Sequence, residues 1–105
     1  MDQTANHPAA DQQPLWTQDE AIAFEVAREA INHVMSICTS EIADEKRKAD
    51  PDAAIVARLE ARITSLHQER TALRLKDHAE IARIRKEYGA VVRAWNRRQD
   101  LLAAE

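Results

Sequence analysis

Several side chains that could act as nucleophiles lie in one short stretch, close to a histidine. They are Ser36, Cys38, Thr39 and Ser40, which follow His33. A nucleophile needs a base within hydrogen-bond reach, and that base needs an orienting group. Five helical residues turn His33 and Cys38 about 140° apart, so the two do not face each other. Cys38 also falls on an apolar stripe, where cysteine is usually a small buried side chain. The sequence therefore predicts no catalytic residue and no enzyme.

Histidines and carboxylates do not follow a metal-ligand pattern. Di-iron bundles place Glu and His three residues apart on facing helices, whereas Glu29 and His33 are four apart and form the nearest match. His67 and His78 share a helix face but lie about 16 Å apart along the axis. The single cysteine excludes an intramolecular disulfide, and its spacing from the histidines fits no zinc site. We expect no metal, cofactor or small-molecule substrate.

Cations and aromatic side chains are interleaved in the last quarter of the chain. Arginine and aromatic residues together can bind phosphates and stack on bases. An alternative is that Trp95 packs in a helical seam while its cations pair with acids, as in the i,i+4 pair Arg83–Glu87. The candidates for nucleic-acid binding are Arg83, Arg85, Lys86, Arg93, Arg97 and Arg98.

Composition limits the fold class and the function. The chain has one Gly and three Pro in 105 residues. Few tight turns are then available, which excludes sandwiches, barrels and Gly-rich nucleotide-binding folds and predicts an all-α chain. Net charge is −3, with ten acids and four bases in residues 1–50 and eight acids and eleven bases in 51–105. This asymmetry suits pairing of the two halves and is weak for a dedicated nucleic-acid protein.

The first half of the chain predicts an arm and a helix. Residues 1–15 are polar without periodicity, which indicates a disordered arm. Thr17 and Glu20 form a capping box at the start of a helix over 17–49, and apolar residues recur along it at helical spacing. This helix and the next one form the predicted helical hairpin, residues 16–105.

A break follows at Asp50–Pro51. Asp50 as N-cap and Pro51 as first residue predict a second helix over 51–103. Because the connection is short, we expect an antiparallel hairpin with coiled-coil-like packing. A kinked continuous helix is the alternative.

The apolar stripe of the second helix runs from Val56 to Leu102 in steps of three and four residues. Double steps of four at 73–77–81 and 91–95–99 are stutters, which locally unwind a coiled coil. Arg70 and Asp77 interrupt the stripe. They either set the register or stay solvated where the seam rotates.

The two predicted helices differ in length, at roughly 50 Å and roughly 80 Å. About 20 apolar-striped residues of the second helix would then protrude, and such a helix needs a partner in water. Either it completes a helical bundle by dimerisation, parallel or antiparallel, or Gly89 ends it and 90–103 folds back as a third helix. Dimerisation is favoured, since no capping residue follows Gly89.

These patterns together predict a non-enzymatic interaction, adaptor or regulatory protein. We expect it to form a homodimer and to bind another protein through its C-terminal helix. No apolar run approaches the roughly 18 residues of a membrane span, and we expect a cytoplasmic location. A nucleic-acid-binding accessory protein is the alternative. The predicted partner-binding residues are Tyr88, Val91, Val92, Trp95 and Leu102.

Overall fold

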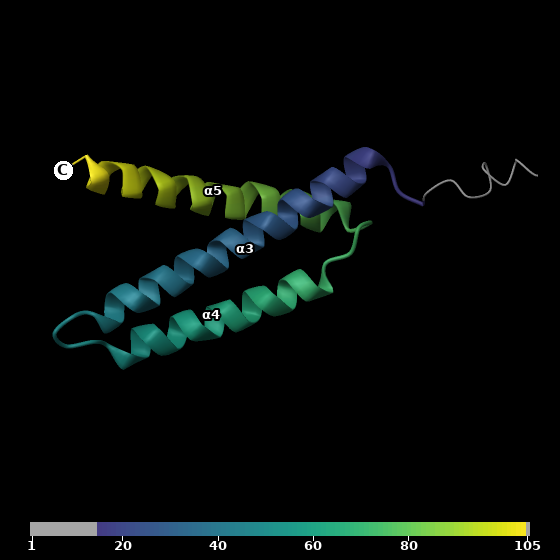
Figure 1. Cartoon of the computed structure of the whole chain (residues 1–105). Coiled ribbons are helices and arrows are strands. Elements are labelled where there is room, and N and C mark those ends of the chain that lie inside the picture. The colour runs from purple at the N-terminus through teal and green to yellow at the C-terminus, as the bar shows by residue number, and fades with distance from the viewer. Residues whose placement is uncertain (1–14, 105) are drawn as a thin grey trace, which may run out of the picture.

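The protein is all-helical over residues 15–104, which are the residues that the computed structural model describes. Three α-helices and no strand occur there: α3 (Gln18–Lys46), α4 (Ala53–Ala72) and α5 (His78–Ala103), labelled as in Figure 1. The all-α prediction is thereby confirmed. The disordered arm predicted for residues 1–15 lies, apart from Leu15, outside the described residues.

The predicted capping box starts α3. Glu20 N donates to Thr17 Oγ1 at 3.0 Å, and Thr17 N donates to Glu20 Oε1 at 2.9 Å. Two of the backbone N–H groups that the first turn leaves unpaired are thus satisfied reciprocally. The prediction of a helix start at Thr17 is confirmed.

The α3–α4 connection is longer than predicted. α3 ends at Lys46 rather than at residue 49, and α4 has Asp52, not Asp50, as its N-cap. The buried carboxylate of Glu45 accepts from Asp52 N and from Lys48 Nζ, both at 2.9 Å. The hydrogen bond from Lys48 holds the pKa of Glu45 below its usual range. Glu45 therefore closes the turn, and Asp52, with Ala54 N donating to it at 2.9 Å, begins α4.

The prediction of one continuous helix over 51–103 is wrong. The chain leaves the helix after Ala72 and re-enters it at His78, so two helices take the place of one. Leu73 adopts an extended backbone and its side chain is buried in the core. The break falls within the stutter at 73–77–81, at a place without Gly or Pro.

Polar side chains stabilise this break. The guanidinium of Arg74 donates to the carbonyl oxygens of Thr71, Ala72 and Leu73 at 3.0 to 3.3 Å, which α4 leaves unpaired at its end. Asp77 Oδ2 accepts from Arg74 N at 3.0 Å. The sequence left open whether Asp77 sets the register or stays solvated. In the structure, Asp77 closes the turn into α5.

The start of α5 is fixed to the start of α3 by a group of polar residues that we call the Glu20 cluster: Glu20, Thr17, Lys76 and His78. Lys76 Nζ donates to both oxygens of Glu20 at 2.9 and 3.0 Å, and His78 Nε2 lies 2.6 Å from Glu20 Oε2. The hydrogen bond from Lys76, followed by those from Thr17 and His78, lowers the pKa of Glu20 to about 2. Residues 56 to 58 positions apart are joined in this way.

As a result, α5 runs back along α3, and α4 is antiparallel to both (Figure 1). α3 packs closely against α4 and against α5, whereas the backbones of α4 and α5 lie farther apart and the two helices meet through side chains, as at Glu69 and Tyr88. The α3–α4 hairpin is as predicted, but no stretch of about 20 residues projects beyond it. A third helix does fold back, though not at Gly89, which lies inside α5.

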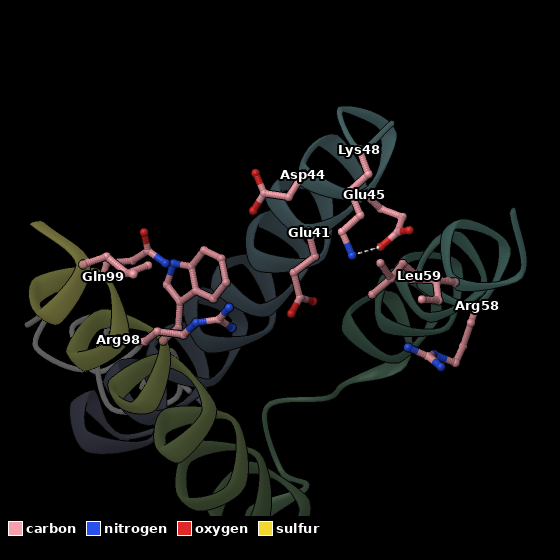
Figure 2. A pocket seen from close by; sticks show the side chains of 11 residues that line it. Glu41, Asp44, Glu45, Lys48, Arg58, Leu59, Arg98 and Gln99 are labelled. Atoms are coloured by element: carbon pink, nitrogen blue, oxygen red, sulfur yellow. Dashed lines mark hydrogen bonds and ion pairs between the residues drawn. The ribbon is translucent and has the colours of Figure 1, made fainter. Parts of the chain in front are cut away.

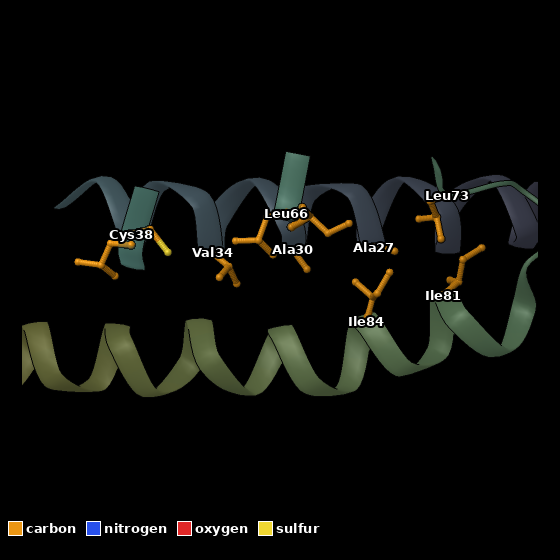
Figure 3. Packing of buried hydrophobic residues seen from close by; sticks show 10 residues of the cluster. Ala27, Ala30, Val34, Cys38, Leu66, Leu73, Ile81 and Ile84 are labelled. Carbon is orange, nitrogen blue, oxygen red and sulfur yellow. The ribbon is translucent and has the colours of Figure 1, made fainter. Parts of the chain in front are cut away.

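The buried apolar core is concentrated where all three helices are close. Figure 3 shows its side chains between α3 and α5, with Ile81 and Ile84 on the first turns of α5. Ile31 and Val34 on α3, Leu66 on α4 and Ile84 on α5 are its largest fully buried side chains. Past Ile84, α5 contributes no fully buried residue within the described part of the chain. Its second half is therefore covered far less than its first.

Gly89 gives a test of the unbroken α5. A Cβ at this position would meet Arg93 Nη1 at 3.1 Å, which is the far end of a flexible side chain. Gly89→Ala is expected to raise the free energy of unfolding by about 0.5–1 kcal/mol, because alanine loses less backbone entropy in a helix. Urea denaturation followed by circular dichroism measures this. Ala90→Gly, at the neighbouring position, which is exposed, should lower the free energy of unfolding by a similar amount. A lower stability of Gly89→Ala would contradict the helix here.

The Glu20 cluster gives a prediction on pH. Because the folded pKa of Glu20 is about 2 against an ordinary 4.5, its stabilising effect is complete above about pH 4.5. The effect is lost as the pH falls from there towards 2. Wild type should therefore unfold at higher urea than Glu20→Gln at neutral pH, and the difference should shrink through this window. Glu25→Gln, which removes an exposed carboxylate 3.6 Å from Arg28, is the control. A difference that does not change with pH would refute this role for Glu20.

Candidate functional site

The second half of α5 diverges from the α3–α4 hairpin (Figure 1). Two adjoining cavities, of about 490 and 250 Å³, lie between the three helices there. They share Glu41 of α3, Leu59 of α4, and Trp95 and Arg98 of α5. We call the two cavities together the C-terminal groove.

Each helix contributes both apolar and charged side chains to the C-terminal groove. Figure 2 shows Glu41 and Asp44 on α3, Arg58 and Leu59 on α4, and Arg98 on α5 around the larger cavity. The remaining lining residues are Val34, Ile37, Cys38, Glu45 and Lys48 of α3 and its C-terminal turn, Ile55 and Arg62 of α4, and Val91, Ala94, Gln99 and Leu102 of α5. The apolar lining residues, which we call the apolar floor of the groove, thus lie among charged ones.

Three of the five predicted partner-binding residues line this groove. They are Val91, Trp95 and Leu102. Val91 is 38% exposed and Leu102 is 52% exposed, which is high for apolar side chains on the inner face of a helix. Val92 instead packs against the core, as does the ring of Tyr88. The structure therefore brings three of the five predicted residues together in the groove and uses the other two, Tyr88 and Val92, for internal packing.

Tyr88 belongs to a network that joins α5 to the end of α4, which we call the Arg83 cluster: Arg83, Glu69, Glu80, Glu87 and Tyr88. The Tyr88 hydroxyl donates to Glu69 Oε1 at 2.6 Å. Arg83 donates to Glu69 and Glu80 at 2.6 Å and to Glu87 at 2.9 Å. The guanidinium of Arg83 also lies 5.7 Å from the centre of the Tyr88 ring. α5 diverges from α4 just beyond this cluster.

The hydrogen bonds of the Arg83 cluster favour a charged Arg83 and a protonated Tyr88 hydroxyl. The hydrogen bonds that Arg83 donates to carboxylates, first of all to Glu80, raise the pKa of Arg83 further above its ordinary value. Burial first, and then the hydrogen bond to Glu69, raises the pKa of Tyr88, which keeps its hydroxyl protonated as a donor. Because its guanidinium binds three carboxylates of its own chain, Arg83 is engaged internally, and the alternative of a cation paired with acids holds for this residue.

The other predicted nucleic-acid-binding residues lie on two faces of α5. Arg98 lines the C-terminal groove. Arg85, Lys86 and Arg93 line a separate depression of about 530 Å³ between α3 and α5, which we call the basic depression; its other lining residues are Val26, Ala30, Ala82 and Gly89. Arg97 is exposed on α5 and lines neither of them.

Sequence reasoning missed the groove residues contributed by the hairpin. Arg58 and Arg62 lie one helical turn apart on α4, and Glu41 faces them from α3. The predicted hairpin gave no reason to place these residues opposite Trp95, because α5 was expected to continue α4. One signal in the sequence that could have indicated a further helix here is Ile37, which makes the apolar stripe of α3 wider than a single partner helix needs.

Cys38 and the other polar side chains considered for chemistry form no metal-binding group within the described residues. Cys38 is buried in the core, and burial raises the pKa of its thiol. In residues 15–104 no three His, Cys, Asp or Glu side chains come together to hold a metal ion. Nor does any helix there have the length and apolar character needed to cross a membrane.

Comparison with protein-family models, with curated proteins and with solved structures finds no match for this chain. Function is therefore argued from two features of the described residues: the C-terminal groove, with its exposed apolar floor, and the basic depression on the neighbouring face of α5.

Proposed function

We propose that the chain is a non-enzymatic protein-interaction module that receives an amphipathic helix of a partner in its C-terminal groove. One observation carries this proposal: α4 and α5 each pack closely on α3, but past the Arg83 cluster they are separated by the C-terminal groove. A helix in the open position would contact all three and complete a four-helix bundle. Binding of a helix in an apolar groove is a recurring mode of peptide recognition.

The apolar side chains in the groove support this proposal. Leu102 is 52% exposed and Val91 38% exposed, on the same side of α5 as the half-buried Trp95. Helices normally bury such a stripe against another element. Tryptophan is also among the residue types that contribute most to binding energy at interfaces. The groove thus combines an incompletely covered stripe with a suitable anchor residue.

The observed fold removes the original reason to expect self-association. Dimerisation was expected because a long second helix would project from the hairpin, and the break at 73–77 removes that projection. What stays unpartnered is the groove. A second copy of the chain is one possible source of the helix that fills it, and the homodimer stays a prediction.

Trp95→Ala tests the groove as the binding site. We expect the variant to lose about 2 kcal/mol of binding free energy, or roughly 30-fold in affinity, because an interface tryptophan loses its buried contacts. Photo-crosslinking from Val91 in native lysate identifies the partner, and the purified pair is then titrated. Ile22→Ala, which truncates an exposed apolar residue of α3 outside the groove, is the matched control. Equal affinity of Trp95→Ala and wild type would reject the groove.

A second candidate function is nucleic-acid binding at the basic depression. The observation that favours it is that Arg85, Lys86 and Arg93 line one depression together with no carboxylate among its lining residues. No ion pair joins these three cations to another described residue. Phosphates of a nucleic acid are one class of anion that could bind there.

Salt dependence tests this second function. Three phosphate contacts predict a slope of about −3 in a plot of log affinity against log salt for duplex DNA. Fluorescence anisotropy with labelled DNA and RNA measures it. Arg85→Ala/Lys86→Ala/Arg93→Ala should abolish the binding, whereas Arg58→Ala/Arg62→Ala, outside the depression, should retain it. Absence of binding at low salt, or binding that salt does not weaken, would exclude this function.

A further inference from the structure

The charges around the C-terminal groove are not all neutralised within the chain. Glu45 pairs with Lys48 at 2.9 Å, and Asp44 pairs with Arg47. Four other charged residues line the groove, and in the described part of the chain none of them forms an ion pair: Glu41, Arg58, Arg62 and Arg98. Three unpaired cations thus stand against one unpaired anion.

These cations lie on two sides of the apolar floor. Arg58 and Arg62 are one turn apart on α4, at about 6 Å along its axis. Arg98 extends from α5 on the other side, and Glu41 projects from α3 into the space between (Figure 2). The guanidinium of Arg62 lies 6.0 Å from the centre of the Tyr88 ring, a cation–π distance that holds it at the inner end of the groove.

A helix that fills the groove would remove water from these arginines. An ionised side chain that loses water without gaining a partner costs several kcal/mol. Charges placed opposite their counter-charges avoid this cost, and like charges in the same positions oppose binding. The helix must therefore bring carboxylates to both sides of its apolar stripe.

We infer, resting on the proposed function, that the occupant of the C-terminal groove is an amphipathic helix of another protein with Asp or Glu flanking its apolar stripe. Carboxylates one turn apart on one edge pair with Arg58 and Arg62. A carboxylate on the opposite edge pairs with Arg98. A single basic residue toward α3 is accommodated by Glu41.

The three described helices of the chain do not have this chemistry on a free face. The second half of α5 carries Arg93, Arg97 and Arg98 against one acid, Asp100. A second copy that inserted α5 would bring cations to cations. α3 is acidic, but its apolar stripe already packs against α4 and α5. Charge therefore favours a different protein over a second copy.

Two designed peptides test the inference on the full chain. Both have 18 residues and the same leucine stripe at helical spacing, and one has Glu and the other Lys on both flanks. Titration calorimetry should show the Glu peptide binding at least about tenfold more tightly than the Lys peptide. Arg58→Glu/Arg62→Glu/Arg98→Glu should reverse this preference. Arg85→Glu/Lys86→Glu/Arg93→Glu makes the same change in net charge at the basic depression and should preserve it.

The outcomes separate this inference from the proposed function. If both peptides bind equally and Trp95→Ala weakens both, the groove binds helices but the requirement for carboxylates is wrong. If neither peptide binds more tightly to wild type than to Trp95→Ala, the proposed function itself fails. If the chain alone sediments as a dimer that Trp95→Ala dissociates, a second copy fills the groove, and the inference of a different protein is overturned.

Circular dichroism checks that each triple variant remains helical. Should the Glu triple variant lose helix content, Arg58→Gln/Arg62→Gln/Arg98→Gln removes the charges without adding new ones. It is expected to abolish the preference for the Glu peptide rather than reverse it. A preference that survives these substitutions would show that the three arginines do not select the partner.

Discussion

The five residues between α4 and α5 determine where every apolar side chain of α5 lies. Had the helix continued past Ala72, its stripe would have extended away from α3. Instead Arg74 binds the free carbonyl groups at the end of α4, and Asp77 accepts from the backbone of Arg74. The Glu20 cluster then holds the start of α5 against the start of α3. Because α5 is anchored at this end, its first turns are buried, and its far end can diverge from the hairpin.

Electrostatic pairing divides α5 into two parts. In the first part, Arg83 binds three carboxylates and Tyr88 donates to one of them, whereas Arg85 and Lys86 face the basic depression without an ion-pair partner among the described residues. In the second part, none of the cations has an ion-pair partner among the described residues. Ile84 is the last fully buried residue of α5 in the described chain. The ion pairs of α5 and its fully buried residues thus both lie in its first half.

Much of the fold followed from local signals in the sequence. The capping box at Thr17, the apolar stripe through Ile31 and Val34, and the all-α class are all confirmed. These features depend on residues close in sequence, whose helical geometry is known in advance. The second break was missed because its turn contains no Gly or Pro. The break depends on Arg74 and Asp77. Arginine and aspartate are also common on the exposed faces of continuous helices, so they do not mark a break.

For a related reason, the sequence predicted only the part of the candidate site that lies on α5. The periodicity of α5 identified Trp95 and Leu102, since one stripe on one helix is readable from spacing alone. Arg58 and Glu41 come from other helices, and their position opposite Trp95 exists only because α5 folds back. Gly89 attracted attention as a possible break, yet it lies within an intact helix. The sequence alone did not show whether Gly89 ends a helix or lies inside one.

The open seam between α4 and α5 and the chemistry of its proposed occupant have one physical origin. To close the seam, the second half of α5 would have to move towards α4 and bring Arg98 towards Arg58 and Arg62. Among the described groove residues, Glu41 is the one carboxylate without an ion-pair partner to offset three cations. Like charges brought together in a drying interface raise the free energy steeply, because water no longer screens them. Burial of Val91 and Leu102, which are 38% and 52% exposed, would offset part of this cost. An acidic helix in the groove would neutralise the same three arginines and bury these two apolar side chains at the same time.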